Sequence, residues 1–220
     1  MSLVFAPSAA ATVPVEGGGS FPVHRIYCVG RNYAEHAVEM GHTGREPPFF
    51  FLKPADTVVP VAEGETGQIP YPTLTKNFHH EIELVVAIGP GGSIFGYAVG
   101  LDMTRRDLQN EMKKQGRPWS IGKAFEQSAP IGPIVPVART GELTSGAITL
   151  DVNGVRRQTG DLKDLIWNVA ETIEQLALAW NLQAGDLIYT GTPAGVGAVV
   201  RGDVMEGRID GLGSLRVEVV

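Results

Sequence analysis

The sequence predicts an α+β protein that is mainly β, for three reasons. Short runs rich in β-branched and aromatic residues recur along the chain, and 28 glycines and 15 prolines supply the turns between them. Only three segments have the apolar spacing or the end signals of a helix. No internal repeat or low-complexity linker divides the 220 residues, which are enough for one sizeable core. We expect one domain over residues 21–220 and an extended N-terminal arm over residues 1–20.

Seven runs predict strands, and one of them, "IELVVAIG", is apolar almost throughout and predicts a buried strand. Asn153-Gly154 follows another run and predicts a two-residue hairpin turn. The expected strands lie at residues 24–30, 48–54, 82–89, 95–102, 146–154, 185–191 and 213–220.

Each of the three helices is predicted from its own signals. Asn32 can cap the first helix and Gly41 can end it. Thr104 can cap the second helix and Gly116 can end it. The third has apolar residues at helical spacing and should pack on the core. The expected helices cover residues 32–40, 104–116 and 166–180.

The composition excludes several classes of protein. A net charge of −6 without a block of Lys or Arg argues against a general binder of nucleic acid or anionic membranes. No apolar run approaches the length of a membrane span, and the N-terminal segment lacks the basic start of a signal peptide. The single cysteine, Cys28, lies in an apolar run, where packing is expected of it, and it allows no intrachain disulfide. We expect a cytoplasmic protein.

Three carboxylates form the main candidate site. Glu81 and Glu83 in "HHEIEL" are two residues apart on an expected strand and therefore point to the same side. Asp102 ends the run "FGYAVGLD", directly before the second helix. Together the three would suit a hard divalent cation such as Mg²⁺ or Mn²⁺. The alternative for the Glu81–Glu83 pair alone is a polar strand face exposed to water. His79 and His80 are interpreted as supporting or packing residues.

Polar residues nearby could complete the site. Arg106 and Gln109 share a face of the second helix, whereas Arg105 is expected in solvent. Lys123 could pair with the carboxylates or hold an anionic oxygen. "TGTPAGVG" lacks the pattern of a phosphate loop and predicts a tight turn that presents the Thr192 hydroxyl.

On the first helix, His36 and Glu39 are three residues apart. An imidazole oriented by a carboxylate is a common general base. The alternative is a surface contact of a few tenths of a kcal/mol.

An ordered set of motifs resembles the fumarylacetoacetate hydrolase family. The motifs are "CVGRNYAEH", "FLKP", "HHEIEL", "LDMTRRDLQ", "GKAFEQSAP", "VNGVRRQ" and "GDLIYTGTPAGVG", and the likeness runs from about Ile26 to the C-terminus. The single-domain acylpyruvate hydrolases of the family are most similar, and "FPVHRIYCVGRNYAEH" is similar to the fumarylpyruvate hydrolases among them. Family members usually carry extra residues, including a short helix, between "AIGPGGS" and "FGYAVG".

The resemblance implies a mixed β-sandwich roll over the catalytic domain, a homodimer, and one Mg²⁺ or Mn²⁺ ion per subunit. It implies that Glu81, Glu83 and Asp102 are the metal ligands and that Arg106, Gln109 and Thr192 bind substrate. It also implies three catalytic residues. Lys123 would face the substrate, and His36 and Glu39 would be the pair that activates water.

The resemblance also implies a reaction, in which a metal-dependent hydrolase cleaves a carbon–carbon bond of an acylpyruvate, a small anionic keto acid. The favoured case gives fumarate and pyruvate from fumarylpyruvate, as in aromatic degradation. The alternatives are decarboxylation of oxaloacetate, isomerisation or hydration of a related ring-cleavage product, and a metal-stabilised binding protein without turnover.

Overall fold

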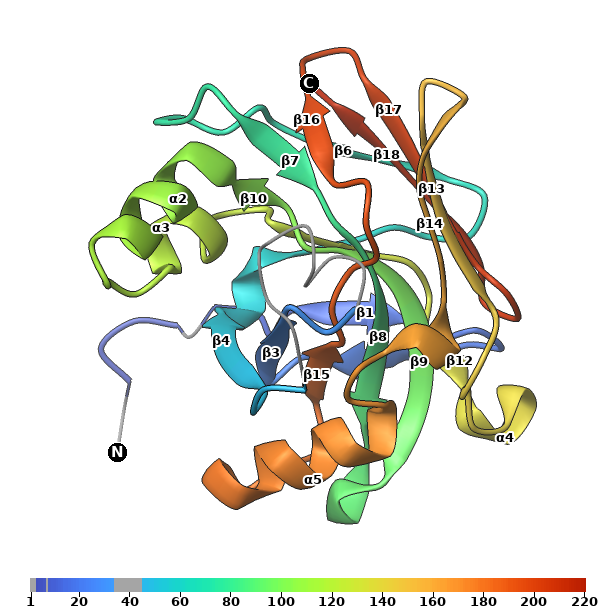
Figure 1. Cartoon of the computed structure of the whole chain (residues 1–220). Coiled ribbons are helices and arrows are strands. Elements are labelled where there is room, and N and C mark those ends of the chain that lie inside the picture. The colour runs from blue at the N-terminus through green and yellow to red at the C-terminus, as the bar shows by residue number, and fades with distance from the viewer. Residues whose placement is uncertain (1–2, 7, 34–44) are drawn as a thin grey trace.

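The computed structural model describes residues 3–6, 8–33 and 45–220 (Figure 1). Strands dominate this part of the chain, as the sequence predicts. Its helices are α2 (Arg106–Lys114), α3 (Ser120–Lys123), α4 (Val137–Thr140) and α5 (Val169–Ala179), with single 3₁₀ turns η1 (Ala55–Thr57), η2 (Pro90–Gly92) and η3 (Leu162–Asp164).

The largest sheet is mixed and has the order β4-β3-β15-β8-β9-β11-β5, with β12 also paired to β9. β3 runs parallel to β15 and β11 parallel to β5, and the other pairs are antiparallel. Its strands are β3 (Arg25–Gly30), β4 (Phe49–Lys53), β5 (Val58–Pro60), β8 (Ile82–Ile88), β9 (Ile94–Leu101), β11 (Ala129–Ile131), β12 (Val135–Pro136) and β15 (Asp186–Tyr189).

A second sheet, with the order β14-β13-β17-β18-β6, packs across one face of the first, and two small sheets complete the fold. The second sheet contains β6 (Thr66–Ile69), β13 (Ala147–Val152), β14 (Val155–Asp161), β17 (Val204–Ile209) and β18 (Gly213–Val219). One small sheet has the order β10-β7-β16 and contains β10 (Thr104–Arg105), β7 (Phe78–His80) and β16 (Gly197–Val199). The other is the hairpin of β1 (Thr12–Pro14) and β2 (Ser20–Pro22).

Strand β8 lies between two hydrophobic cores and is buried over its whole length. Leu84 and Val86 face the core that is shared with the second sheet. Val85 and Ala87 face the other core, together with Cys28. Burial raises the pKa of the Cys28 thiol well above its usual value, so this residue packs rather than reacts. The apolar run of the sequence is explained by this burial on both faces.

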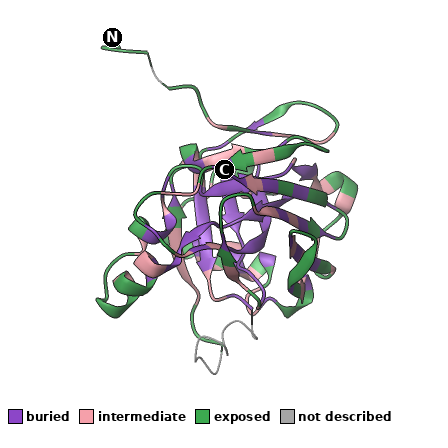
Figure 2. Cartoon of the chain, turned by 90° about the horizontal axis from the view of Figure 1, so that it is seen from above, coloured by how far each residue is buried: buried purple, intermediate pink, exposed green. Residues whose placement is uncertain are grey.

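Only part of the N-terminal segment extends away from the domain, and the rest packs against it. Its first described residues lead away from the body of the molecule (Figure 2). β1 then pairs with β2, and Val13 is fully buried in the core that contains Cys28. The expected boundary at residue 20 falls within this hairpin and stays a prediction.

All seven expected strands are confirmed to within two residues at each end. Asn153 and Gly154 have φ angles of 51° and 75°, as a two-residue turn with two left-handed positions requires, and they join β13 to β14. The expected first helix lies outside the described residues from residue 34 onward. Between β8 and β9, where the resemblance predicts extra residues, the chain has a short turn containing η2.

The second and third helices form, but their starts were predicted too early. Thr104 does not cap α2, because it belongs to β10 and pairs with His79 of β7, and its hydroxyl donates to the Asp102 carbonyl oxygen. α5 begins after Asn168, which makes a capping box with Glu171.

Arg105 is not in solvent, contrary to the expectation. Its side chain is buried, and its guanidinium carbon lies 4.2 Å from the centroid of the Phe125 ring. Pairing of β10 with β7 fixes the backbone of Arg105 and so places this side chain against the domain.

Among the described helices, none is both long and apolar enough to cross a membrane.

Gly100 of β9 gives a stability test of the sheet packing. An added Cβ would lie 2.5 Å from Val85 Cγ2 and 2.7 Å from Tyr189 Cε1, and both of these side chains are buried. We expect Gly100→Ala to lower the free energy of unfolding by about 1–3 kcal/mol, the usual cost of overpacking. Gly132→Ala is the control, since its Cβ would meet no atom closer than 3.7 Å. Urea unfolding of both variants measures the difference, and equal midpoints would contradict the packing argument.

Candidate metal and substrate site

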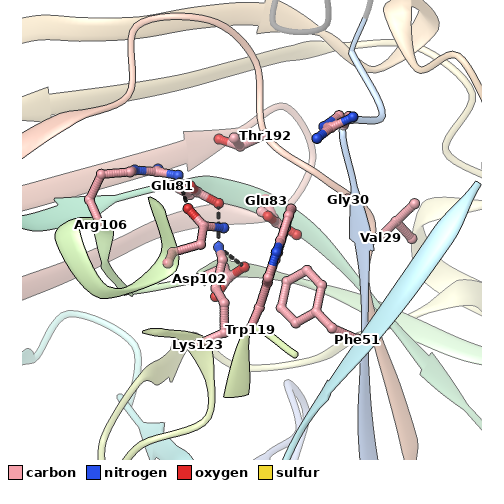
Figure 3. Close-up of a pocket in the computed structure, with 12 residues that line it drawn as sticks. Val29, Gly30, Phe51, Glu81, Glu83, Asp102, Arg106, Trp119, Lys123 and Thr192 are labelled. Atoms are coloured by element: carbon pink, nitrogen blue, oxygen red, sulfur yellow. Dashed lines mark hydrogen bonds and ion pairs between the residues drawn. The ribbon is translucent and has the colours of Figure 1, made fainter. Parts of the chain in front are cut away.

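The sheet brings Glu81, Glu83 and Asp102 together, as the sequence predicts. Glu83 on β8 pairs with Gly100 on β9, and the Asp102 N–H donates to the Glu81 carbonyl oxygen at 2.8 Å just beyond the paired strands. Alternation along both strands therefore puts the three side chains on one face. Each offers a carboxylate oxygen, and these oxygens lie within 4.8 Å of one another (Figure 3). The residues are 6%, 2% and 1% exposed, so the alternative of a solvated face is wrong.

Three cations from three different elements surround these carboxylates. Lys123 Nζ, at the end of α3, donates to Glu81 Oε2 at 2.8 Å and to Asp102 Oδ2 at 2.6 Å. Arg106 Nη2, at the start of α2, donates to Glu81 Oε1. Lys53 Nζ, at the end of β4, lies 2.8 Å from Asp102 Oδ1. Buried carboxylates at such short separations are tolerated because these charges offset them.

Burial and the neighbouring charges together shift the pKa values of Glu83 and Lys123. Burial raises the pKa of Glu83 well above its usual value, and the negative charges of Asp102 and Glu81 raise it further. Burial acts in the opposite direction on Lys123, but the same two carboxylates outweigh it and leave the pKa of Lys123 above its usual value. Lys123 is therefore a stable ammonium group within the site.

The donor set fits a hard divalent cation. It consists of carboxylate oxygens alone, which Mg²⁺ and Mn²⁺ prefer to nitrogen or sulfur. Asp102 Oδ1 is buried and accepts no hydrogen bond from the described residues, although Lys53 is close to it. Such an oxygen has a lone pair free for a metal ion.

Arg106 and Gln109 share one face of α2, as their spacing predicts, and both line the pocket that holds the carboxylates. Arg106 Nη1 donates to Gln109 Oε1 at 2.5 Å, and Arg106 Nε donates to His79 Nδ1 at 3.3 Å. Burial, followed by the charge of Arg106, lowers the pKa of His79 to about 4. His79 is therefore a neutral acceptor that supports Arg106, in line with the supporting role expected for it.

Thr192 also lines this pocket, in the loop that follows β15. Gly191 of the same loop donates its N–H to Glu83 Oε2 at 2.8 Å, so the loop is fixed to the carboxylate cluster. His36 and Glu39, the expected water-activating pair, lie outside the described residues.

Sequence reasoning missed Lys53, although the run "FLKP" contains it. Its side chain is fully buried and donates to Ser128 Oγ at 3.0 Å, to the Met103 carbonyl oxygen at 3.3 Å and to the Lys123 carbonyl oxygen. Lys53 follows Phe49 and Phe51 at a spacing of two residues, so all three point to the same side of the strand. A lysine on the same side as two aromatic residues is the signal that could have revealed its burial.

The model of the family "Fumarylacetoacetate (FAA) hydrolase C-terminal" matches residues 25–220, which is most of the chain. The chain belongs to the fumarylacetoacetate hydrolase family. Its fold is the one that the resemblance implied.

Two relatives and one solved structure illustrate this membership. Fumarylpyruvate hydrolase of a Ralstonia species is 46% identical over 185 residues, which is 79% of this chain and 93% of that protein. The mitochondrial oxaloacetate tautomerase FAHD1 of Rattus norvegicus is 40% identical over 204 residues, 88% of this chain and 90% of that protein. The crystal structure of fumarylpyruvate hydrolase from Pseudomonas aeruginosa with Mn²⁺ and pyruvate is 56% identical, with a TM-score of 0.97 over 100% of this chain and 99% of that one.

Replacing Asp102 by Asn tests the carboxylate set as a metal site. The change keeps the size of the side chain but removes one negative charge and replaces one of the two carboxylate oxygens by an NH₂ group, so Mn²⁺ affinity should fall by at least about tenfold. Titration calorimetry with Mn²⁺ measures it, and circular dichroism confirms that the variant is folded. Glu174→Gln on the exposed side of α5 is the control and should bind Mn²⁺ like the unaltered protein. Unchanged affinity in Asp102→Asn would contradict the proposed ligand role.

Proposed function

We propose that the protein is a divalent-metal-dependent hydrolase that cleaves the carbon–carbon bond of an acylpyruvate, with fumarylpyruvate as the favoured substrate. The observation that carries the proposal is the buried set of three carboxylates with Lys123 and Arg106 in one pocket. The 46% identity to a fumarylpyruvate hydrolase, and the similar structure that holds Mn²⁺ and pyruvate, support it. The cytoplasmic location and the homodimer expected from the sequence stay predictions.

In this proposal Glu81, Glu83 and Asp102 hold one Mg²⁺ or Mn²⁺ ion. When bound, the ion would supply Lewis-acid stabilisation of the negative charge that develops on the substrate. Lys123 is suited to help, because it is a buried ammonium group beside two of the ligands and offers hydrogen bonds to an enolate oxygen.

Arg106 and Gln109 are the proposed anchors for the keto acid. A guanidinium that is already held by His79 and Gln109 loses little freedom when it binds a substrate carboxylate, which makes it an effective anchor. The Thr192 hydroxyl lies in the same pocket and can contact a substrate oxygen.

His36, oriented by Glu39, is the proposed base that takes a proton from water. The hydroxide attacks the acyl carbonyl carbon, the bond from that carbon to the methylene group of pyruvate breaks, and its electron pair forms the pyruvate enolate. Protonation of the enolate gives pyruvate, and the acyl group leaves as a carboxylic acid. One water is consumed, and no oxidant or reductant is needed.

The second candidate is an isomerase acting on oxaloacetate, and the 40% identity to an oxaloacetate tautomerase favours it. Tautomerisation needs the same stabilised enolate but no attack by water. Decarboxylation of oxaloacetate, hydration of a ring-cleavage product and metal-stabilised binding without turnover remain alternatives from the sequence. All of these candidates would use the same three carboxylates. They differ in whether a water molecule must be activated for the reaction.

A substrate panel separates these activities. Purified protein with Mg²⁺ or Mn²⁺ is assayed for pyruvate release from fumarylpyruvate, from acetylpyruvate and from oxaloacetate, and for enol–keto conversion of oxaloacetate by ultraviolet absorbance. We expect release from acylpyruvates, fastest with fumarylpyruvate, and loss of that activity on chelation. Conversion of oxaloacetate without any acylpyruvate cleavage would replace the hydrolase proposal by the tautomerase.

Substitution of His36 by Ala tests the proposed base. Acylpyruvate hydrolysis should fall by about a hundredfold or more, the usual size of general-base catalysis, while Mn²⁺ affinity stays unchanged. Any decarboxylation of oxaloacetate should fall much less, since it needs no activated water. Both rates are measured on one preparation. An equal loss of both rates, or full retention of hydrolysis, would show that His36 is not the base.

A further inference from the structure

Gln158 of β14 joins two segments of the candidate site that are far apart in the sequence. Its side chain is fully buried. Its Oε1 accepts a hydrogen bond from the Ile82 N–H at 3.1 Å and lies 2.9 Å from His80 Nδ1. Its Nε2 donates to Thr192 Oγ1 at 2.8 Å and to the Pro193 carbonyl oxygen at 2.9 Å. One amide thus connects the residues on both sides of Glu81, through the His80 ring and the Ile82 backbone, to the loop of Thr192.

The backbone partners fix the direction of this amide. The Ile82 N–H can only donate and the Pro193 carbonyl can only accept, so Oε1 must face the first and Nε2 the second. His80 Nδ1 must then carry a proton, because the oxygen beside it has none to give.

The same logic applies to the Thr192 hydroxyl. Its oxygen accepts a hydrogen bond from Gln158 Nε2, so its own O–H remains available to donate to a second partner. Thr192 lines the pocket that contains the three carboxylates, Lys123 and Arg106. In the proposed function, an oxygen atom of a substrate bound in that pocket would be the acceptor for this O–H group.

Close packing leaves little freedom for another arrangement. A Cβ at Gly160 of β14 would lie 2.7 Å from Pro193 Cβ, and a Cβ at Gly195 would lie 2.1 Å from the Arg157 carbonyl oxygen. Strand β14 and residues 193–195 therefore approach each other without intervening side chains, and Gln158 reaches Thr192 across this short gap.

We infer that Gln158 is a positioning residue that holds the Thr192 hydroxyl as a hydrogen-bond donor to a keto-acid substrate. The inference rests on the proposed function in that the substrate binds in this pocket. It assigns a role to the motif "VNGVRRQ", which otherwise contributes only a hairpin.

The test is a double-mutant cycle with Gln158→Met and Thr192→Val, read out by pyruvate affinity in the presence of Mn²⁺. Met has nearly the shape of Gln but no N–H group. Each single variant should weaken pyruvate binding by about tenfold, as expected for one hydrogen bond to a charged ligand. The double variant should be no weaker than either single one, because both remove the same contact. Thr192→Ser keeps the hydroxyl and should restore most of the pyruvate affinity that Thr192→Val loses.

Two controls separate positioning from general support. Mn²⁺ affinity should be unchanged in every variant, since no carboxylate is altered. Gln68→Met, the same substitution at an exposed residue on β6, should change neither pyruvate binding nor the melting temperature.

Several results would overturn the inference. These are a lower melting temperature with normal pyruvate affinity in Gln158→Met, losses that multiply in the double variant, and normal affinity in Thr192→Val. The last applies even if Gln158→Met fails to fold. Should the unaltered protein bind pyruvate but cleave no acylpyruvate, the proposed function would fail while the cycle still decides the role of Gln158. An unaltered protein that binds no pyruvate would overturn both.

Discussion

Much of the architecture around the pocket follows from three carboxylates that are buried within a few ångströms of one another. Carboxylates in such a place lose their hydration and repel each other. Ion pairs with Lys53, Lys123 and Arg106, each from a different element, offset this cost. The charge balance therefore also ties β4, α2 and α3 to Glu81, directly before β8, and to Asp102, directly after β9. The ion pairs of Arg106 and Lys123 thus connect α2 and α3 to the site.

The sequence predicted this site well where the chemistry is local. Alternation along a strand put Glu81 and Glu83 on one side, and the strand that ends at Asp102 has the expected limits to within two residues. The interpretation of Thr104 as a cap was wrong because a Thr before a charged helical run fits a cap and a short strand equally well. Only its pairing with His79, a residue 25 positions earlier, decides between them.

Residues whose role depends on distant partners were not predictable in this way. Lys53 meets Asp102, and Gln158 meets Thr192, across separations that no local pattern records. Arg105 was expected in solvent for the same reason, since Phe125 is not its neighbour in the sequence. Helical spacing placed Arg106 and Gln109 on one face, and the resemblance to a known family added the prediction that they and Lys123 face the substrate.

Cys28 has a practical consequence. Its thiol is fully buried in the core beside β8, and burial keeps it protonated, so reagents that attack thiolates have neither access nor a nucleophile there. For conjugation chemistry the described part of the molecule therefore behaves as if it had no cysteine. A cysteine introduced at the exposed Asn110, on the same helix as Arg106 and Gln109, would be the one thiol to react with a fluorophore or spin label. Ligand binding could then be followed by a single probe close to the pocket, without removing the natural thiol.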